Sequence, residues 1–403
     1  MPIDAAEARK VLADEGDYLL TQVDRLDFSE TVWALAKIIR FLRRAELAAV
    51  VSPETATDDI GFATLVGPIV GSRGVAGDVA ALYQLALAGA LTMDLDAEDF
   101  HRVNRWPDVP TRVQSTLTAC AWPTRSVTQD QTVRATGAMH DLRPTYGLLL
   151  ELVRVYYQRH DMAGVLSLLH LASDHLGLLA WRDSLGDLHP ATLAGVVASH
   201  EAIWGTAVGK VKCPQLNRVR QVVKGVNPRS PKPLIAVLQV LNSRAAAMII
   251  ECSPTGGFSP GGLQRCTRPC GVPATTLAAG DRAATNTLAE RTALAQFFSR
   301  SDIVLARHGS PVGHFFSVPT RHEVDAMWAK TCSTLAAECH DAATKTGRPA
   351  WTFPEVAGEP LPGLGALFAH VAGDPQPMAE ATVTEALTDE FRRRLSDAVA
   401  GGR

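Results

Sequence analysis

A possible catalytic serine lies at residues 257–261 (GFSPG), which match the spacing of a nucleophile elbow. An elbow needs a strand directly before it and a helix directly after it, within a fold of alternating strands and helices. The surrounding residues 252–279 are instead rich in Gly, Pro, Ser and Thr and carry no helical period. This composition favours a long loop over a serine hydrolase site.

Three further patterns lack a residue that their chemistry requires. The His-Glu pair at 322–323 has Ala326 where a zinc protease helix places its second histidine. The segment 205–210 (GTAVGK) has neither the spacing of a phosphate loop nor the hydroxyl that would hold magnesium. The aspartate pair at 58–59 has no further acid at the spacing of a metal–diphosphate site and favours a surface turn.

The cysteines and histidines are compatible with a metal site but do not favour one. Cys252, Cys266 and Cys270 have an unpaired C-x3-C spacing, and with His308 or His314 they form the only arrangement that suggests four-ligand zinc. Free loop cysteines are the simpler interpretation. The seven cysteines are odd in number and scattered, which is typical of free thiols in a reducing compartment. We therefore expect no metal, no cofactor and no enzymatic activity.

The strongest signal in the chain is a basic stretch at residues 202–250. It contains no acidic residue, although the whole chain is slightly acidic, with 42 Asp and Glu against 39 Lys and Arg. At that density a window of this length would hold about five carboxylates. Such segregation is typical of a surface that meets an anionic partner. Its bases are Lys210, Lys212, Arg218, Arg220, Lys224, Arg229, Lys232 and Arg244.

Part of this stretch, residues 214–226, has the period of an amphipathic helix. Asn217, Arg220 and Lys224 fall on its polar face, because residues three and four apart are neighbours on a helix, and Arg218 flanks that face. The remaining bases belong mostly to the two connections beside the helix. The pattern therefore predicts the basic lip of a cleft.

A second basic set occupies residues 101–134, where Arg102 and Arg105 stand close to Trp106. Arg112, Arg125 and Arg134 belong to the same set, which Asp108 and Asp130 dilute. Arginines beside aromatic rings suit phosphate contact combined with base stacking. The competing interpretation is a surface loop whose tryptophans, Trp106 and Trp122, anchor it to the core.

Apolar residues mostly recur three and four positions apart, so the chain is predicted to be all-α, with two helical lobes and a basic cleft between them. Residues 1–205 are predicted as an N-terminal helical lobe, 206–280 as a basic connecting region with a Gly/Pro-rich loop, and 281–403 as a C-terminal helical lobe with a terminal arm. The last helix, at 378–399, follows a Pro/Gly linker and either folds back onto its own lobe or docks on a neighbouring copy. The other expected helices are 4–13, 29–50, 75–91, 96–104, 144–160, 161–179, 190–205, 214–226, 233–250, 281–299, 321–346 and 364–371.

The N-terminal residues MPIDAAEARKVLADEGD carry acids where a signal peptide needs bases, and they lack an apolar run. The most apolar stretch, 233–250, is interrupted by polar residues and is too short to span a membrane. The sequence therefore predicts a soluble, intracellular protein without a membrane partner.

A helical chain with its bases concentrated near the middle resembles the nucleoproteins and helical coat (capsid) proteins of RNA viruses. In that group RNA is held in a groove between two lobes, and exchanged arms or loops link neighbouring subunits. The resemblance covers the general layout of the whole chain. It implies a structural RNA-binding protein that coats a nucleic-acid genome as a homo-oligomer, in the virion and the host cytoplasm. The loop at 252–279 and the last helix would be the linking elements.

Three other classes stay open from the sequence. One is an icosahedral shell capsid protein, in which the basic stretch only lines an inner surface. Another is a helical enzyme whose basic cleft holds a phosphorylated small molecule. The last is a cellular helical scaffold that binds other proteins. The sequence also leaves open whether the RNA is single- or double-stranded.

Overall fold

The computed structural model describes residues 76–97, 99–121, 141–185, 282–309, 318–346 and 358–401, together with Thr352 and Pro354. Helices make up most of these residues and no strand occurs among them, which confirms the all-α prediction for the described part of the chain. The two lobes and the basic cleft depend on residues outside these ranges and stay a prediction.

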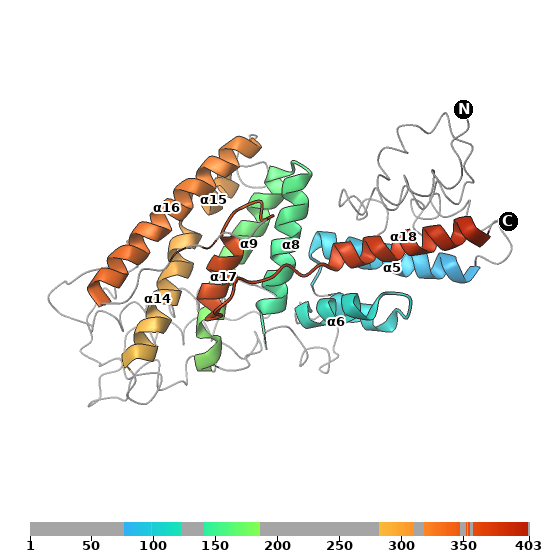
Figure 1. The fold of residues 1–403 in the computed structure, drawn as a ribbon, viewed down its shortest axis with the longest axis horizontal. Coiled ribbons are helices and arrows are strands. Elements are labelled where there is room, and N and C mark those ends of the chain that lie inside the picture. The colour runs from blue at the N-terminus through green and yellow to red at the C-terminus, as the bar shows by residue number, and fades with distance from the viewer. Residues whose placement is uncertain are drawn as a thin grey trace, which may run out of the picture. The chain divides into compact units, whose positions relative to one another are not determined.

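These residues belong to two compact units (Figure 1). The first unit contains 76–97, 99–121 and 381–401, and the second contains 141–185, 282–309, 318–346 and 358–380. The predicted domain boundaries at 205 and 280 lie outside the described residues, so the predicted division is not tested by this arrangement.

The first unit is built from α5 (Ala76–Asp94), the 3-10 helix η3 (Phe100–Arg105), α6 (Thr111–Cys120) and α18 (Val383–Gly401). The last helix, α18, packs against α5 and α6 (Figure 1). Leu91, Leu117 and Leu387, one from each of these helices, are completely buried. The C-terminal helix therefore completes the core of a unit whose other helices come from the N-terminal third of the chain.

The second unit is organised around α9 (Met162–Leu185), which packs against helices on several sides (Figure 1). Within α9, Met162–Arg182 is the one segment of the described helices that is long and apolar enough to cross a membrane, and 61% of it is buried inside the protein. That degree of burial is also what the core helix of a globular unit shows. Around it lie α8 (Arg143–Gln158), α14 (Arg282–Ser299), α15 (Asp302–Leu305), η6 (Ala306–Gly309) and α17 (Leu364–Ala372), and α16 (Arg321–Thr346) packs on α14 and α15.

A chain of aromatic rings joins four helices of the second unit. Tyr146 of α8 meets Phe368 of α17 edge to face, with ring centroids 4.9 Å apart. Phe368 meets Phe298 of α14 at 6.2 Å, and Phe298 meets Trp328 of α16 at 6.5 Å. Edge-to-face pairs of this kind contribute about 0.5–1.5 kcal/mol each beyond the area that they bury. The ring contacts thus hold together four helices that are far apart in the sequence.

Side-chain caps set the starts of two helices. Asp161, at the start of the predicted helix 161–179, caps α9, because its Oδ1 accepts the backbone N–H of Gly164 at 2.9 Å. At the start of α16, the Thr320 hydroxyl accepts the N–H of Glu323, and the Glu323 carboxylate accepts the N–H of Thr320. This reciprocal pair is a capping box, so Glu323, the glutamate of the incomplete zinc-protease pattern, has a structural role.

The prediction for residues 101–134 differs from the structure in one element, because α6 forms where the loop interpretation expected none. Its sequence, TRVQSTLTAC, is rich in residues of modest helix propensity, which hides the helix from a propensity argument. Val113, Leu117 and Cys120 nevertheless recur at helical spacing and are buried. The predicted helix at 96–104 is instead the shorter 3-10 helix η3, which ends at Arg105 with Trp106 as its C-cap, before Pro107.

Candidate nucleic-acid interface

The predicted binding residues divide into two groups. The eight bases between Lys210 and Arg244 lie outside the described residues. Arg102 and Arg105 are described, and both belong to η3 in the first unit. The candidate interface is therefore built from η3 and the elements that pack around it.

The geometry of η3 separates its charged and apolar side chains. A 3-10 helix has three residues per turn, so residues three apart align along one edge. Phe100 and Val103 share one edge and are completely buried. Arg102 and Arg105 share another edge, where Arg105 is exposed. Burial of the apolar edge thus orients both arginines away from the core.

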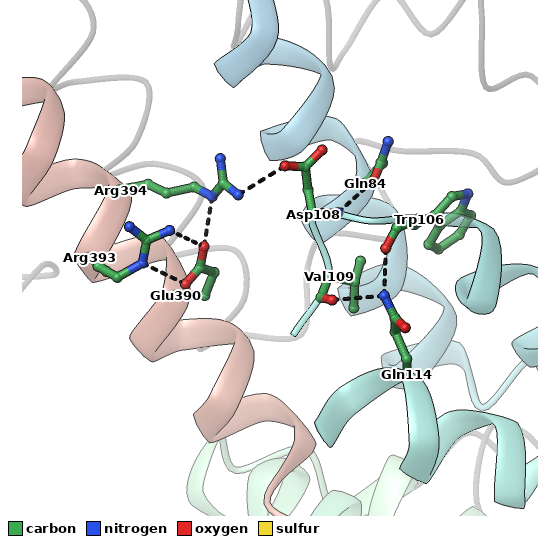
Figure 2. Close-up of polar contacts among 8 residues, drawn as sticks. All are labelled: Gln84, Trp106, Asp108, Val109, Gln114, Glu390, Arg393 and Arg394. Carbon is green, nitrogen blue, oxygen red and sulfur yellow. Dashed lines mark hydrogen bonds and ion pairs between the residues drawn. The ribbon is translucent and has the colours of Figure 1, made fainter. Parts of the chain in front are cut away.

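The loop after η3 is held by two glutamines (Figure 2). The side-chain amide of Gln114, on α6, donates to the carbonyls of Trp106 and Val109 at 2.7 and 2.9 Å. The side-chain oxygen of Gln84, on α5, accepts the backbone N–H of Asp108 at 3.2 Å. Together with the turn bond from the N–H of Val109 to the carbonyl of Trp106, these bonds give the segment between η3 and α6 a defined conformation.

Three carboxylates near η3, those of Asp99, Asp108 and Glu390, are paired with arginines. Asp99 Oδ2 lies 2.8 Å from Arg102 Nη1. Asp108 Oδ1 lies 3.2 Å from Arg394 Nη2 of α18. Glu390, also on α18, accepts hydrogen bonds from both Arg393 and Arg394 (Figure 2). The Arg393 contact, followed by that of Arg394, holds the pKa of Glu390 below its usual range.

Two arginines of this region keep positive charge that no described carboxylate compensates. Arg105 is exposed, and Arg112 is exposed with its guanidinium donating to the hydroxyl of Thr382. Trp106 lies between them in the sequence and is half-buried. Exposed guanidinium groups and a partly exposed indole in one segment suit phosphate contact and stacking, and RNA binding by residues 101–134 stays a prediction. Arg102 is the weaker candidate because Asp99 already neutralises it.

No cluster of three or more His, Cys, Asp or Glu side chains suited to a metal ion occurs among the described residues. The cysteines of the zinc alternative, Cys252, Cys266 and Cys270, lie outside them. His175 of α9 has its Nδ1 3.2 Å from the carbonyl of Leu171. Burial lowers the pKa of His175, so the ring favours its neutral form. His175 thus resembles a packed helix residue more than a general base.

The sequence interpretation did not single out one group of the second unit. Tyr156 and Tyr157 lie in the last turn of α8. The guanidinium of Arg159 lies over the ring of Tyr156, and that of Arg321 lies over the ring of Tyr157. The sequence YYQRH at 156–160 carries an aromatic–basic signal of the kind recognised at 101–134.

The chain matches no protein-family model, and no curated protein or solved structure is significantly similar to it.

Proposed function

We propose that this protein is a structural RNA-binding protein that contacts the phosphate backbone and assembles with copies of itself along the nucleic acid. The observation that carries the proposal is the segregation of charge in the sequence, with eight bases and no acid between residues 202 and 250. Binding that does not depend on base sequence needs lysines and arginines near phosphates, together with a few stacking surfaces.

The first unit supports the proposal at a second place. Arg105 and Arg112 are exposed, while the nearby carboxylates Asp99 and Asp108 are paired with other arginines. Arg105 and Arg112 thus keep their positive charge, although the chain as a whole carries a formal charge of −3. Local charge governs association with a polyanion, so an acidic chain is compatible with RNA binding.

The proposed assembly has two candidate linking segments, which are the loop at 252–279 and helix α18. In the structure α18 packs on α5 and α6 of its own chain. The role of either segment in joining subunits is part of the proposal.

The test is to purify the full chain from cells without nuclease treatment and to record its absorbance spectrum and negative-stain images. We expect copurifying RNA, seen as high absorbance at 260 nm, and filaments or rings. Closed spheres would favour the icosahedral shell. Protein that is free of nucleic acid, and that does not bind added single-stranded or duplex RNA at low salt, would contradict the proposal.

A further inference from the structure

The segment that joins η3 to α6 is tied to the C-terminal helix at two places. Asp108 Oδ1 of this segment lies 3.2 Å from Arg394 Nη2 of α18 (Figure 2). Arg112, in the first turn of α6, donates to the hydroxyl of Thr382, the residue before α18. Thr382 and Arg394 are separated by about three helical turns. The helix therefore contacts the segment near its own start and again well along its length.

Asp108 occupies a turn that begins at Trp106. The N–H of Val109 donates to the carbonyl of Trp106 at 3.1 Å, and the N–H of Asp108 donates to Gln84 Oε1 at 3.2 Å. Both bonds hold the backbone of the turn without any contribution from Arg394. The Asp108 carboxylate thus stays close to Trp106 even when its arginine partner is removed.

Arg394 compensates two carboxylates, and only one of them has a second arginine. Its Nε donates to Glu390 Oε1 at 2.9 Å, while its Nη2 faces Asp108 (Figure 2). Arg393 also donates to Glu390, through Nε and Nη2. Within the described part of the chain, Asp108 forms an ion pair with Arg394 alone. Loss of Arg394 would therefore leave Glu390 paired and Asp108 unpaired.

The charge of Asp108 matters because exposed arginines lie on both sides of it in the sequence. Arg105 precedes the turn and Arg112 follows it. A guanidinium has five N–H donors, so Arg112 can bond to Thr382 and still donate to a phosphate. The opposite charges of an ion pair largely cancel at longer range, whereas an unpaired carboxylate repels a phosphate. The pair with Arg394 thus decides whether this segment presents an uncompensated negative charge.

We infer that Arg394 is a positioning residue for RNA contact by the segment 105–112, and that it acts through Asp108. With α18 docked, Arg394 compensates the carboxylate that would otherwise repel phosphates bound to Arg105 and Arg112. The inference rests on the proposed function and adds to it a coupling between the C-terminal helix and RNA. Because coupling between two equilibria is reciprocal, bound RNA should also stabilise the docked position of α18.

The test compares Arg394→Gln with Arg393→Gln in the full chain. Both variants remove one positive charge from the same turn of α18, and Arg393, whose side chain is 57% exposed, pairs with Glu390. Binding to fluorescein-labelled poly(U) is measured by anisotropy over a series of salt concentrations. We expect Arg394→Gln to bind about threefold to tenfold more weakly than Arg393→Gln at low salt, as expected for one unpaired charge close to a phosphate. The difference should shrink at high salt because salt screens exposed charges.

A rescue experiment separates the charge of Asp108 from a general loss of structure. Adding Asp108→Asn to Arg394→Gln removes the unpaired carboxylate, so affinity should recover to within about twofold of the wild type. The control adds Glu385→Gln instead, which removes an exposed carboxylate in the first turn of α18 and gives the same net charge. We expect this control to recover little affinity. A variant that had lost its fold would be rescued by neither substitution.

The outcomes distinguish this inference from the function on which it rests. If the wild type binds poly(U) while Arg394→Gln and Arg393→Gln bind equally well, the inference fails and the proposed function stands. Weaker binding by Arg394→Gln that Asp108→Asn does not restore would show a purely structural role and would also overturn the inference. If the wild type does not bind RNA, the proposed function fails and the inference fails with it.

Hydrogen exchange tests the reciprocal effect in the wild type. Saturating poly(U) should slow amide exchange in α18, because RNA favours the state in which Arg394 compensates Asp108. The double variant Asp108→Asn/Arg394→Gln lacks the coupling, so RNA should leave the exchange of its α18 unchanged. Exchange in the wild-type helix that is the same with and without RNA would contradict the coupling.

Discussion

Asp108 and Arg394, 286 positions apart in the sequence, form an ion pair in which Oδ1 and Nη2 are 3.2 Å apart (Figure 2). Arg394 comes from the C-terminal helix, and Asp108 comes from the loop between η3 and α6. Their side chains are 17% and 33% exposed. The pair thus joins the last helix to the loop that carries Trp106, and it places the C-terminal helix beside the candidate RNA-binding residues of the first unit.

A double-mutant cycle tests this pair. We expect Asp108→Asn and Arg394→Gln to couple by about 0.5–1 kcal/mol in urea unfolding, because the pair is partly shielded from solvent. The single variants each lose the pair, so the double variant should cost less than their sum. Additive effects would show that the contact does not stabilise the docked position of α18.

Glu390 predicts a specific pH dependence. Its two arginine contacts hold the folded-state pKa below the ordinary value of 4.5. A carboxyl with a lowered folded-state pKa contributes stability that is fully present above its unfolded pKa and is lost as the pH falls through the folded value. The Tm of the wild type should therefore exceed that of Glu390→Gln near neutral pH, and the difference should shrink between about pH 5 and about pH 3. A difference that stays constant over this range would contradict the assignment.

Tyr146 tests the core of the second unit. Its buried hydroxyl donates to the carbonyl of Ala172 at 2.6 Å, which ties α8 to α9. Tyr146→Phe keeps the ring against Phe368 and removes only this hydrogen bond, so we expect a loss of about 1 kcal/mol. The urea unfolding midpoint measures it. An unchanged midpoint would mean that the bond adds nothing to the packing of these helices.

Gly373 closes α17 in a left-handed conformation, with φ of +81°. A Cβ there would lie 2.8 Å from the guanidinium of Arg291, a nearly buried side chain that donates to the carbonyl of Val371. Gly358 is the matched control, because its φ is +92° and nothing lies within 4 Å of its Cβ position.

Both glycine-to-alanine variants should lose about 1–2 kcal/mol from the left-handed backbone alone. We expect Gly373→Ala to lose a further 1–3 kcal/mol, roughly the cost of overpacking, as it displaces Arg291. Thermal unfolding of the two variants gives the difference. Equal losses would show that Arg291 adjusts without cost.

The sequence predicted most described helices because their apolar periodicity is strong. The predicted helix 321–346 coincides with α16, and the predicted helix 161–179 begins at Asp161, which caps α9. The helix α6 was missed since its threonines and serine have modest helix propensity, and packing of Val113 and Leu117 stabilises it instead. Propensity carries no information about such tertiary support.

The pairing of helices could not be predicted in the same way. Periodicity shows which face of α9 or α18 is apolar, but not that α9 packs on α14 or that α18 packs on α5. The sequence also predicted Arg102 as an RNA-binding residue. In the structure Asp99, three positions earlier, forms an ion pair with it. The contact of Arg321 with the ring of Tyr157 likewise joins two residues that only the folded chain brings together.

The most direct test of the central claim is the salt dependence of RNA affinity for the wild type and for Arg218→Gln/Arg220→Gln/Lys224→Gln. If the basic stretch contacts phosphates, the logarithm of the association constant K for RNA should fall linearly with log salt in the wild type. The triple variant should then have a slope smaller by about 2, with weaker binding to every sequence and an unchanged Tm. Identical slopes and affinities for the two proteins would contradict the claim.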